Sequence, residues 1–163
     1  MLAIAEPLPV VRPSCLAVTH LNLTAFRCYD SVRLDLDERP VMVTGPNGAG
    51  KTNLLEAVSF FAPGRGLRRA RLAEADHRAG SRPWAVAARR STTVGMVDIG
   101  TGHDRHTGRR VVHINGAPAR GPIALAEYVS AVWLTPQMDR LFQEGAAARR
   151  RFLARLTFGF HIG

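Results

Sequence analysis

Apolar and polar residues alternate in two segments near the start of the chain. The segment L-A-V-T-H-L-N-L at 16–23 and the segment S-V-R-L-D-L-D at 31–37 both show this alternation, the second more regularly than the first. A period of two is that of a strand with one buried face. We therefore predict an antiparallel hairpin formed by these two segments.

The spacing of apolar residues then changes from that of a strand to that of a helix. The stretch at 41–57 reads V-M-V-T-G-P-N-G-A-G-K-T-N-L-L-E-A. Its first three residues predict a short buried strand, and the apolar positions from Leu54 to Val58 predict the packing face of a helix. Between them lies a glycine-rich turn. The order is therefore strand, turn, helix.

Further strands are predicted at 84–90, 93–99 and 109–114. The last of them is closed by Asn-Gly at 115–116, a pair typical of tight hairpin turns. The segment T-G-H-D-R-H-T-G, which occupies most of 100–108, reads as an exposed loop.

The remaining pattern predicts a helix at 122–129, opened by its proline, and a compact buried strand at 131–135. Good helix formers at 145–158 predict another helix, with apolar residues on one side and arginines on another. The fold class we expect is α/β, with an antiparallel β portion beside a mixed sheet that presents the glycine-rich turn.

The composition indicates a globular domain with a strong positive charge. The chain has 163 residues, of which 46% are hydrophobic, and 22 Lys plus Arg against 13 Asp plus Glu give a formal charge of +9. Such a charge favours polyanionic partners, nucleic acid before a membrane surface. The basic segment at 62–72 carries four arginines that we expect either to contact phosphates of DNA or nucleotide or to lie in a solvated turn: Arg65, Arg68, Arg69 and Arg71.

Several classes of protein are disfavoured. Cys15 and Cys28 lack the C-x-x-C spacing of a metal or redox site, and the six histidines are scattered. Residues 1–14 contain several prolines and read as a flexible lead-in rather than a signal peptide. No apolar run is long enough to span a membrane, so a cytoplasmic protein without a membrane partner is expected.

The glycine-rich turn fits the pattern G-x-x-x-x-G-K-[ST] from Gly45 to Thr52 without a mismatch. In this pattern backbone N–H groups surround the phosphates of a nucleotide, Lys51 reaches the β and γ phosphates, and the Thr52 hydroxyl ligates Mg²⁺. The positive end of the following helix points at the same phosphates. The alternative is a strand-to-helix turn with an exposed lysine.

Hydrolysis of a nucleotide also needs an acidic residue at the end of a second buried strand. The best local candidate is Asp98 in V-G-M-V-D, although lone strand aspartates are common. The sequence contains neither an S-G-G-Q-like segment nor the guanine-reading N-K-x-D motif. A small P-loop kinase or GTPase is therefore disfavoured, as it is by the two strands predicted before the loop.

Five separated segments resemble the N-terminal part of the bacterial RecF family in order and spacing. They are L-N-L-T-A-F-R-C-Y-D, T-G-P-N-G-A-G-K-T-N-L-L-E-A-V with the following P-G-R-G-L-R-R-A-R-L-A-E, V-V-H-I-N-G, W-L-T-P-Q-M-D-R-L-F and R-R-R-F-L-A-R-L. The resemblance implies an ABC-type ATPase lobe, similar to the heads of SMC and Rad50 proteins, that binds ATP and Mg²⁺. It implies a role in DNA replication, recombinational repair and the SOS response, with single-stranded or gapped DNA, RecO and RecR as partners and ATP-dependent homodimerisation of the full-length protein.

The family motif also implies site residues. Lys51 would be the catalytic residue, and Thr52 and Gln137 would approach the metal. The alternatives are that Arg27 is a surface arginine and that Gln137 is an ordinary exposed glutamine. The nucleotide would be bound by Gly45, Pro46, Asn47, Gly48, Ala49, Gly50, Lys51, Thr52, Asn53 and Arg27.

The resemblance divides the chain into an ATP-binding first lobe at 15–143 and the start of a truncated helical second lobe at 144–163. The family's signature motif, Walker B acid, D-loop and switch histidine would all follow residue 163. We therefore expect weak nucleotide binding at most, without the weak DNA-dependent ATPase activity of the family. The alternative is a non-enzymatic module that binds nucleic acid or a partner and holds a nucleotide as a structural ligand.

Overall fold

The computed structural model describes residues 17–80, 82–92, 95–136, 146–147, 149–150 and 152–154. The elements are β1 (Val18–Phe26), β2 (Tyr29–Asp35), α1 (Lys51–Ser59), the 3₁₀ helix η1 (Leu72–Ala75), β3 (Ala85–Thr92), β4 (Gly95–Asp104), β5 (Arg109–Ile114), β6 (Ala117–Pro118) and the 3₁₀ helix η2 (Pro122–Glu127). None of the helices in this described part has the length and apolar composition needed to cross a membrane.

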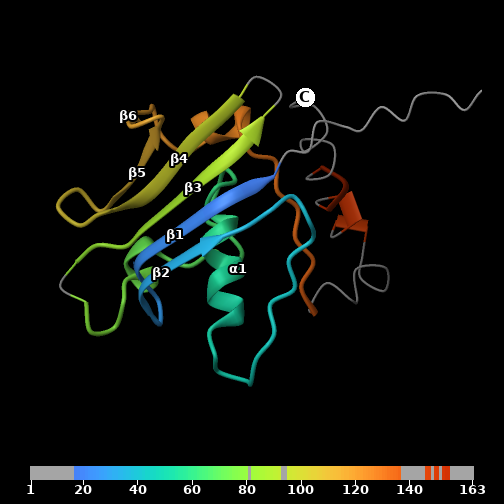
Figure 1. Cartoon of the computed structure of the whole chain (residues 1–163), viewed down its shortest axis with the longest axis horizontal. Coiled ribbons are helices and arrows are strands. Elements are labelled where there is room, and N and C mark those ends of the chain that lie inside the picture. Colours follow the sequence, from blue (N-terminus) through green and yellow to red (C-terminus); the bar gives the residue numbers. More distant parts are fainter. Residues whose placement is uncertain are drawn as a thin grey trace, which may run out of the picture.

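The strands form one sheet in the order β2-β1-β3-β4-β5-β6, and every neighbouring pair is antiparallel. Four of the five pairs join strands that follow each other in the chain. The exception is β1 with β3, between which the chain makes its long excursion through α1 and η1 (Figure 1). This excursion carries the glycine-rich turn.

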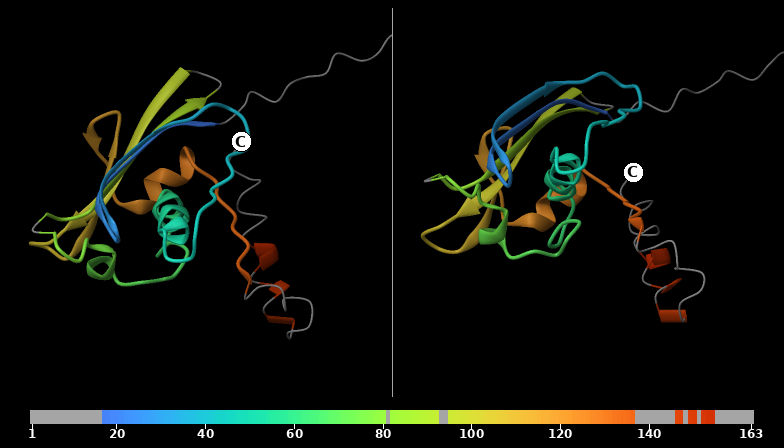
Figure 2. Two further views of the ribbon diagram at one scale, coloured as in Figure 1. Left: turned by 60° about the horizontal axis from the view of Figure 1, so that its bottom comes forward. Right: turned by 90° about the horizontal axis from the view of Figure 1, so that it is seen from below.

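Helices α1, η1 and η2 lie on one side of the sheet, and none of the described elements covers the other side, here called the open face (Figure 2). The strand period decides which side chains face the helices. In β1, Leu21 and Leu23 are buried and Asn22 between them is exposed. In β3, Val86 is buried and the next residue, Ala87, is exposed. Burying a side chain of this kind stabilises the fold by about 1.5–3 kcal/mol.

Three aromatic residues join the sheet to the helix layer. The ring of Phe26 at the end of β1 meets the ring of Trp84 edge-on at 5.4 Å between centroids, and Phe60 after α1 lies 4.9 Å from Trp84. The indole Nε1 of Trp84 donates to the carbonyl oxygen of Leu72 (2.8 Å). Trp84 is fully buried with its polar atom paired, as stability requires.

The hairpin predicted from the first two segments is confirmed, with Leu21 opposite Leu34 and Leu23 opposite Val32. The predicted strand at 109–114 is confirmed at its bounds. Asn115 and Gly116 both have positive φ, at 49° and 79°, as a tight hairpin turn of this kind requires.

The loop predicted at 100–108 is wrong in its first half. Strand β4 continues to Asp104, and only the residues from Arg105 to Gly108 form the turn. Thr101 and His103 are buried in this strand although both are polar. Pairing with β3 on one side and β5 on the other outweighs the weak strand preference of this glycine-containing sequence.

The two short apolar strands predicted at 41–43 and 131–135 are also wrong. Neither segment belongs to a strand, and Met42 and Leu134 expose 86% and 73% of their surface. A strand needs a neighbouring strand for its N–H and C=O groups, and the described sheet includes neither segment. The predicted mixed sheet is therefore not found in the described residues, whose only sheet is antiparallel.

The three predicted helices differ in how well they match the structure. The helix after the glycine-rich turn is confirmed as α1, and the helix predicted at 122–129 is a 3₁₀ helix at Pro122–Glu127. Of the helix predicted at 145–158, the described residues are helical and the others lie outside the described part of the chain.

Candidate nucleotide-binding site

The glycine-rich turn at 45–50 leads from the extended segment directly into α1. Gly45, Gly48 and Gly50 have φ of 143°, 87° and 95°, conformations that residues with a Cβ rarely adopt. Gly50 is the N-cap residue of α1, and its carbonyl oxygen accepts from the N–H of Asn53 (2.7 Å) and Leu54 (3.1 Å). The first N–H groups of a helix have no acceptor within it and carry its positive dipole end. Turn and helix end together therefore have the backbone geometry that suits an anion.

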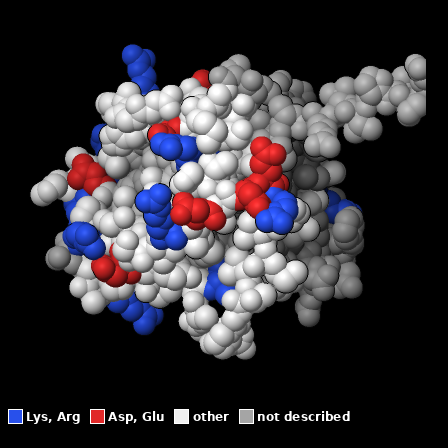
Figure 3. Space-filling view, viewed as in Figure 1, with Lys and Arg blue, Asp and Glu red and all other residues white. Residues whose placement is uncertain are grey.

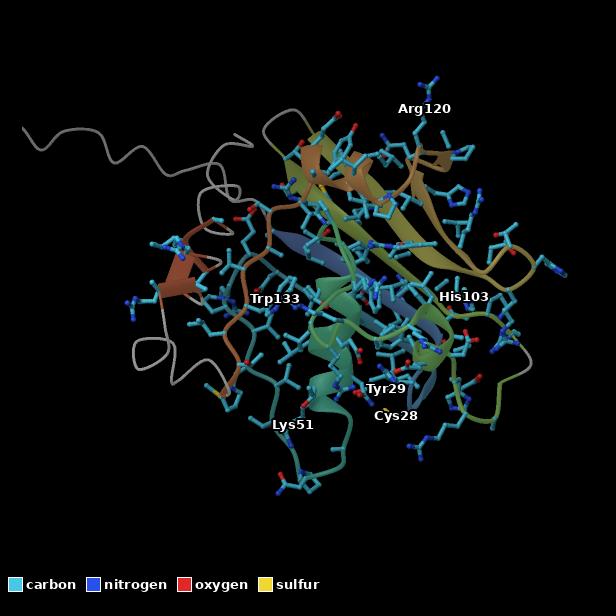
Figure 4. The ribbon with its side chains drawn as sticks, turned by 180° about the vertical axis from the view of Figure 1, so that it is seen from behind. Cys28, Tyr29, Lys51, His103, Arg120 and Trp133 are labelled. Carbon is cyan, nitrogen blue, oxygen red and sulfur yellow. The ribbon has the colours of Figure 1, made fainter. Side chains whose placement is uncertain are left out.

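Lys51, the first residue of α1, points back into this turn. Its ammonium donates to the carbonyl oxygen of Gly45 and to that of Pro46 (2.7 Å). Figure 4 shows Lys51 at the loop end of the helix. A bound phosphate would offer this ammonium a charged acceptor in place of two neutral ones, which is the stronger interaction. The hydroxyl of Thr52 is in the exposed first turn beside it.

The turn between β1 and β2 packs against the end of the glycine-rich turn. A Cβ on Gly50 would come within 2.7 Å of both Cys28 Sγ and the Tyr29 hydroxyl, so only glycine fits here. Asn53 Nδ2 donates to Cys28 Sγ (3.1 Å). Burial raises the pKa of Tyr29, and the neighbouring Cys28 adds to the shift. Figure 4 shows Cys28 and Tyr29 beside the end of α1 that carries Lys51.

Arg27, in the same turn, is held by a carboxylate of α1. Its Nε and Nη2 donate to the two oxygens of Glu56 (2.9 and 2.7 Å). Arg68 Nη1 donates to Glu56 as well (2.7 Å) and to Asn53 Oδ1 (2.8 Å). Two of the arginines predicted to contact phosphates therefore share one buried glutamate. Sequence reasoning missed Glu56, whose only signal is an acidic residue among the apolar positions of the helix.

Two hydrogen bonds hold the backbone of the basic segment that contains Arg68, and several of its arginine side chains are exposed. The Ser59 hydroxyl accepts from the N–H of Leu67 (2.6 Å), and Arg110 Nη1 donates to the Gly64 carbonyl (2.9 Å). The guanidinium of Arg110 lies over the Phe60 ring at 5.5 Å, and burial lowers its pKa to about 10. Within the described part of the chain, the exposed side chains of Arg65 and Arg69 form no hydrogen bond or ion pair.

The structure does not bring Asp98 to the site. Asp98 alternates with the buried Val97 and Ile99 and therefore lies on the open face of the sheet, opposite α1. It accepts two hydrogen bonds from Arg89 (2.7 and 2.9 Å), which hold the pKa of its carboxyl below the usual range. Positive and negative side chains are intermixed over this open face (Figure 3).

The predicted metal ligands are only partly described. Gln137 lies outside the described residues, whereas Thr52 does not. The described segments contain no group of three or more His, Cys, Asp or Glu side chains placed to hold a metal ion. The remaining predicted binding residues, from Gly45 to Asn53 together with Arg27, gather around the start of α1. Their glycine conformations, helix end and lysine fit a polyphosphate.

Comparison with known proteins agrees with this geometry. The AAA domain family model matches residues 20–92, which include the glycine-rich turn and α1. A DNA replication and repair protein RecF of Rhizobium rhizogenes strain K84 is 47% identical over 147 residues, covering 89% of this chain and 39% of that protein. RecF of Mesorhizobium japonicum is 46% identical over 153 residues, covering 93% of this chain and 40% of that protein.

Solved structures show the same fold. One described as the recombination mediator protein RecF-ATPrS in the RecFOR pathway superposes with a TM-score of 0.78 at 22% identity, over 90% of this chain and 39% of that one. The SMC head domain from Thermotoga maritima gives 0.52 at 19% identity, over 63% of this chain and 38% of that one.

The antiparallel sheet with its helix layer thus has the fold of one part of these two solved structures. The sequence identities narrow the comparison: the chain is similar to RecF proteins, at 46% to 47% identity over about nine tenths of its own length. It spans about 39% of the length of the RecF proteins that it matches.

Proposed function

We propose that this chain is the ATP-binding part of a RecF-like protein of DNA replication and repair. The observation that carries the proposal is the glycine-rich turn, closed by Gly50 at the start of α1 with Lys51 pointing into it. Backbone N–H groups of 45–52 would hold the phosphates, and Lys51 would neutralise their charge.

Magnesium would be held by Thr52 and Gln137 together with the phosphate oxygens. When bound, the ion neutralises negative charge on the phosphates and orients them. The fit of this chain to Mg²⁺ rests on the Thr52 hydroxyl in the exposed first turn of α1. Calorimetric titration of the chain with ATP, with and without Mg²⁺, tests the proposal. Saturable binding of one ATP per chain, strengthened by Mg²⁺, supports it, and no saturable binding overturns it.

The activities of a whole RecF protein extend beyond what this chain supplies by itself. We expect ATP-dependent homodimerisation, hydrolysis and assembly with RecO and RecR to require the length of the relatives, of which the chain spans about 39%. In the wider pathway the chain would support recombinational repair and the SOS response by binding ATP and single-stranded or gapped DNA. We expect no turnover of ATP by the chain itself.

The DNA surface that we propose is the part of the basic segment at 64–71. Arg65 and Arg69 are exposed, and their side chains form no hydrogen bond or ion pair with the described residues. Arg68, in contrast, pairs with Glu56. The double variant Arg65→Ala, Arg69→Ala should bind single-stranded DNA about five- to thirtyfold more weakly. The slope of log affinity against log salt should fall by about 1.4, because two phosphate contacts are lost. Fluorescence anisotropy over a salt series measures both.

The matched control removes two arginines from the open face of the sheet, Arg33→Ala with Arg109→Ala. Both are exposed there, so the net charge changes equally. The control should lower affinity less than threefold through the general field alone. Equal losses in the two double variants would contradict a defined DNA surface at 64–71.

A second reading is a non-enzymatic nucleic-acid-binding or partner-binding module with a structural nucleotide. It is favoured by the exposed side chains of Arg65 and Arg69, which need no ATP to bind a polyanion. DNA binding measured with and without ATP separates the two. Equal binding in both conditions favours the passive module, and tighter binding with ATP favours the RecF-like reading.

A further inference from the structure

Glu56 is a buried carboxylate to which the proposed ATP-binding chemistry gives no role. It is 1% exposed and accepts three hydrogen bonds, two from Arg27 and one from Arg68. Two guanidinium groups on one carboxylate leave a surplus positive charge beside the glycine-rich turn. Burying a carboxylate removes its hydration at a large cost in free energy, and these three hydrogen bonds from two guanidinium groups offset that cost.

The partners of Glu56 come from two segments far apart in the sequence. Arg27 belongs to the β1–β2 turn, and its backbone N–H donates to the Ala75 carbonyl (2.8 Å) while Nη1 donates to the Glu74 carbonyl. Arg68 belongs to the basic segment. Glu56 therefore fastens both segments to α1 at one point.

This point is connected to the glycine-rich turn through Asn53. Asn53 and Glu56 are three residues apart and share a face of α1. Arg68 donates to the Asn53 side-chain oxygen, and the Asn53 side-chain nitrogen donates to Cys28 Sγ. Cys28 in turn lies against Gly50, which closes the glycine-rich turn. The contacts of Glu56 thus end on the N-cap residue of the helix that would receive the phosphates.

We propose that Glu56 is a positioning residue of the nucleotide site. It holds Arg27, and with it the β1–β2 turn, against Gly50, and it holds Arg68 on Asn53. It touches no phosphate itself and acts through these two arginines. This inference rests on the proposed function, since it assigns Glu56 to the same ATP site.

The test uses the full chain carrying Glu56→Gln, which keeps the shape of the side chain and removes its charge. ATP affinity measured by calorimetry should fall about tenfold. In the ligand-free protein, amide hydrogen exchange of peptides covering 26–30 and 45–53 should rise about tenfold, while peptides covering 95–104 of β4 should not change. A residue that only stabilised the fold would raise exchange in β4 as well. Asp98→Asn is the matched control, since it disrupts a bidentate arginine pair on the open face.

Arg68→Ala is the second variant, for the case that Glu56→Gln does not fold. It leaves the pair of Arg27 with Glu56 intact, so the fold should persist. Exchange should rise in the peptide covering 45–53, because Arg68 no longer holds the Asn53 side chain at the start of α1. Unchanged exchange there, or ATP affinity of folded Glu56→Gln within twofold of the wild type, overturns this inference alone. No ATP binding by the wild type overturns the proposed function and the inference with it.

Discussion

A chain carrying Lys51→Ala is expected to bind ATP with Mg²⁺ about 30- to 150-fold more weakly than the wild type. The substitution removes charge-assisted hydrogen bonds to phosphate worth about 2–3 kcal/mol. The fold should be unaffected, because the Lys51 ammonium bonds only to two carbonyl oxygens of its own loop. Calorimetric titration with ATP gives the affinities, and thermal unfolding without ATP verifies that the two proteins are equally stable.

The control is Arg39→Ala, which removes an exposed cation from the segment that leads to the same turn. Arg39 pairs only with Asp37 at the surface, 2.6 Å away, and should change ATP affinity less than twofold. A loss in Arg39→Ala equal to that in Lys51→Ala would mean that net charge, not the turn, attracts the nucleotide. ATP hydrolysis by the wild type above the Lys51→Ala background would contradict our expectation that the chain does not turn over ATP.

Residues that are close in sequence made the nucleotide site predictable. The positive φ of Gly45, Gly48 and Gly50 and the helix that begins at Lys51 are local consequences of the G-x-x-x-x-G-K-[ST] spacing. The hairpin was predictable for the same reason, because the period of two places Leu21 and Leu23 on one face. Such features need no knowledge of distant parts of the chain.

The Glu56 cluster could not be predicted in this way. Arg27 and Arg68 lie 29 and 12 residues from Glu56, and no spacing rule states that two arginines converge on one carboxylate. A glutamate on a helix is ordinarily a solvated side chain. In the folded chain this glutamate is 1% exposed and is held by Arg27 of the β1–β2 turn.

The segments at 41–43 and 131–135, which belong to no strand of the described sheet, show another limit of the sequence. A short apolar run is consistent with a buried strand, but a strand is completed only by a neighbour that supplies hydrogen bonds. Conversely, the sequence around Thr101 and His103 does not have a strand pattern, yet both residues lie in a strand because β4 pairs with β3 on one side and with β5 on the other. In each case the partner strand decides the outcome, and the local sequence does not contain it.

Replacing Trp84 by alanine should lower the free energy of unfolding by about 3–5 kcal/mol. Trp84 is 1% exposed and packs against both Phe26 and Phe60. Its loss would leave a cavity between sheet and helix layer and an unpaired Leu72 carbonyl. Domains of this size are stable by about 5–15 kcal/mol, so the variant should unfold at much lower urea concentration or not fold cooperatively. Urea unfolding followed by circular dichroism measures the change.

Trp84→Phe and Trp133→Ala complete this experiment. Trp84→Phe keeps most of the ring contacts and loses the hydrogen bond to Leu72, so it should cost about 1–2 kcal/mol. Trp133 is half-buried and lies outside the aromatic cluster, and its removal should cost less than Trp84→Ala. Equal losses for the two alanine variants would contradict a central role of Trp84.

The same variants should differ in ATP affinity. Because Phe26 directly precedes Arg27, loosening of the aromatic cluster should also displace the turn that packs against Gly50. ATP affinity should therefore fall in Trp84→Ala but not in Trp133→Ala.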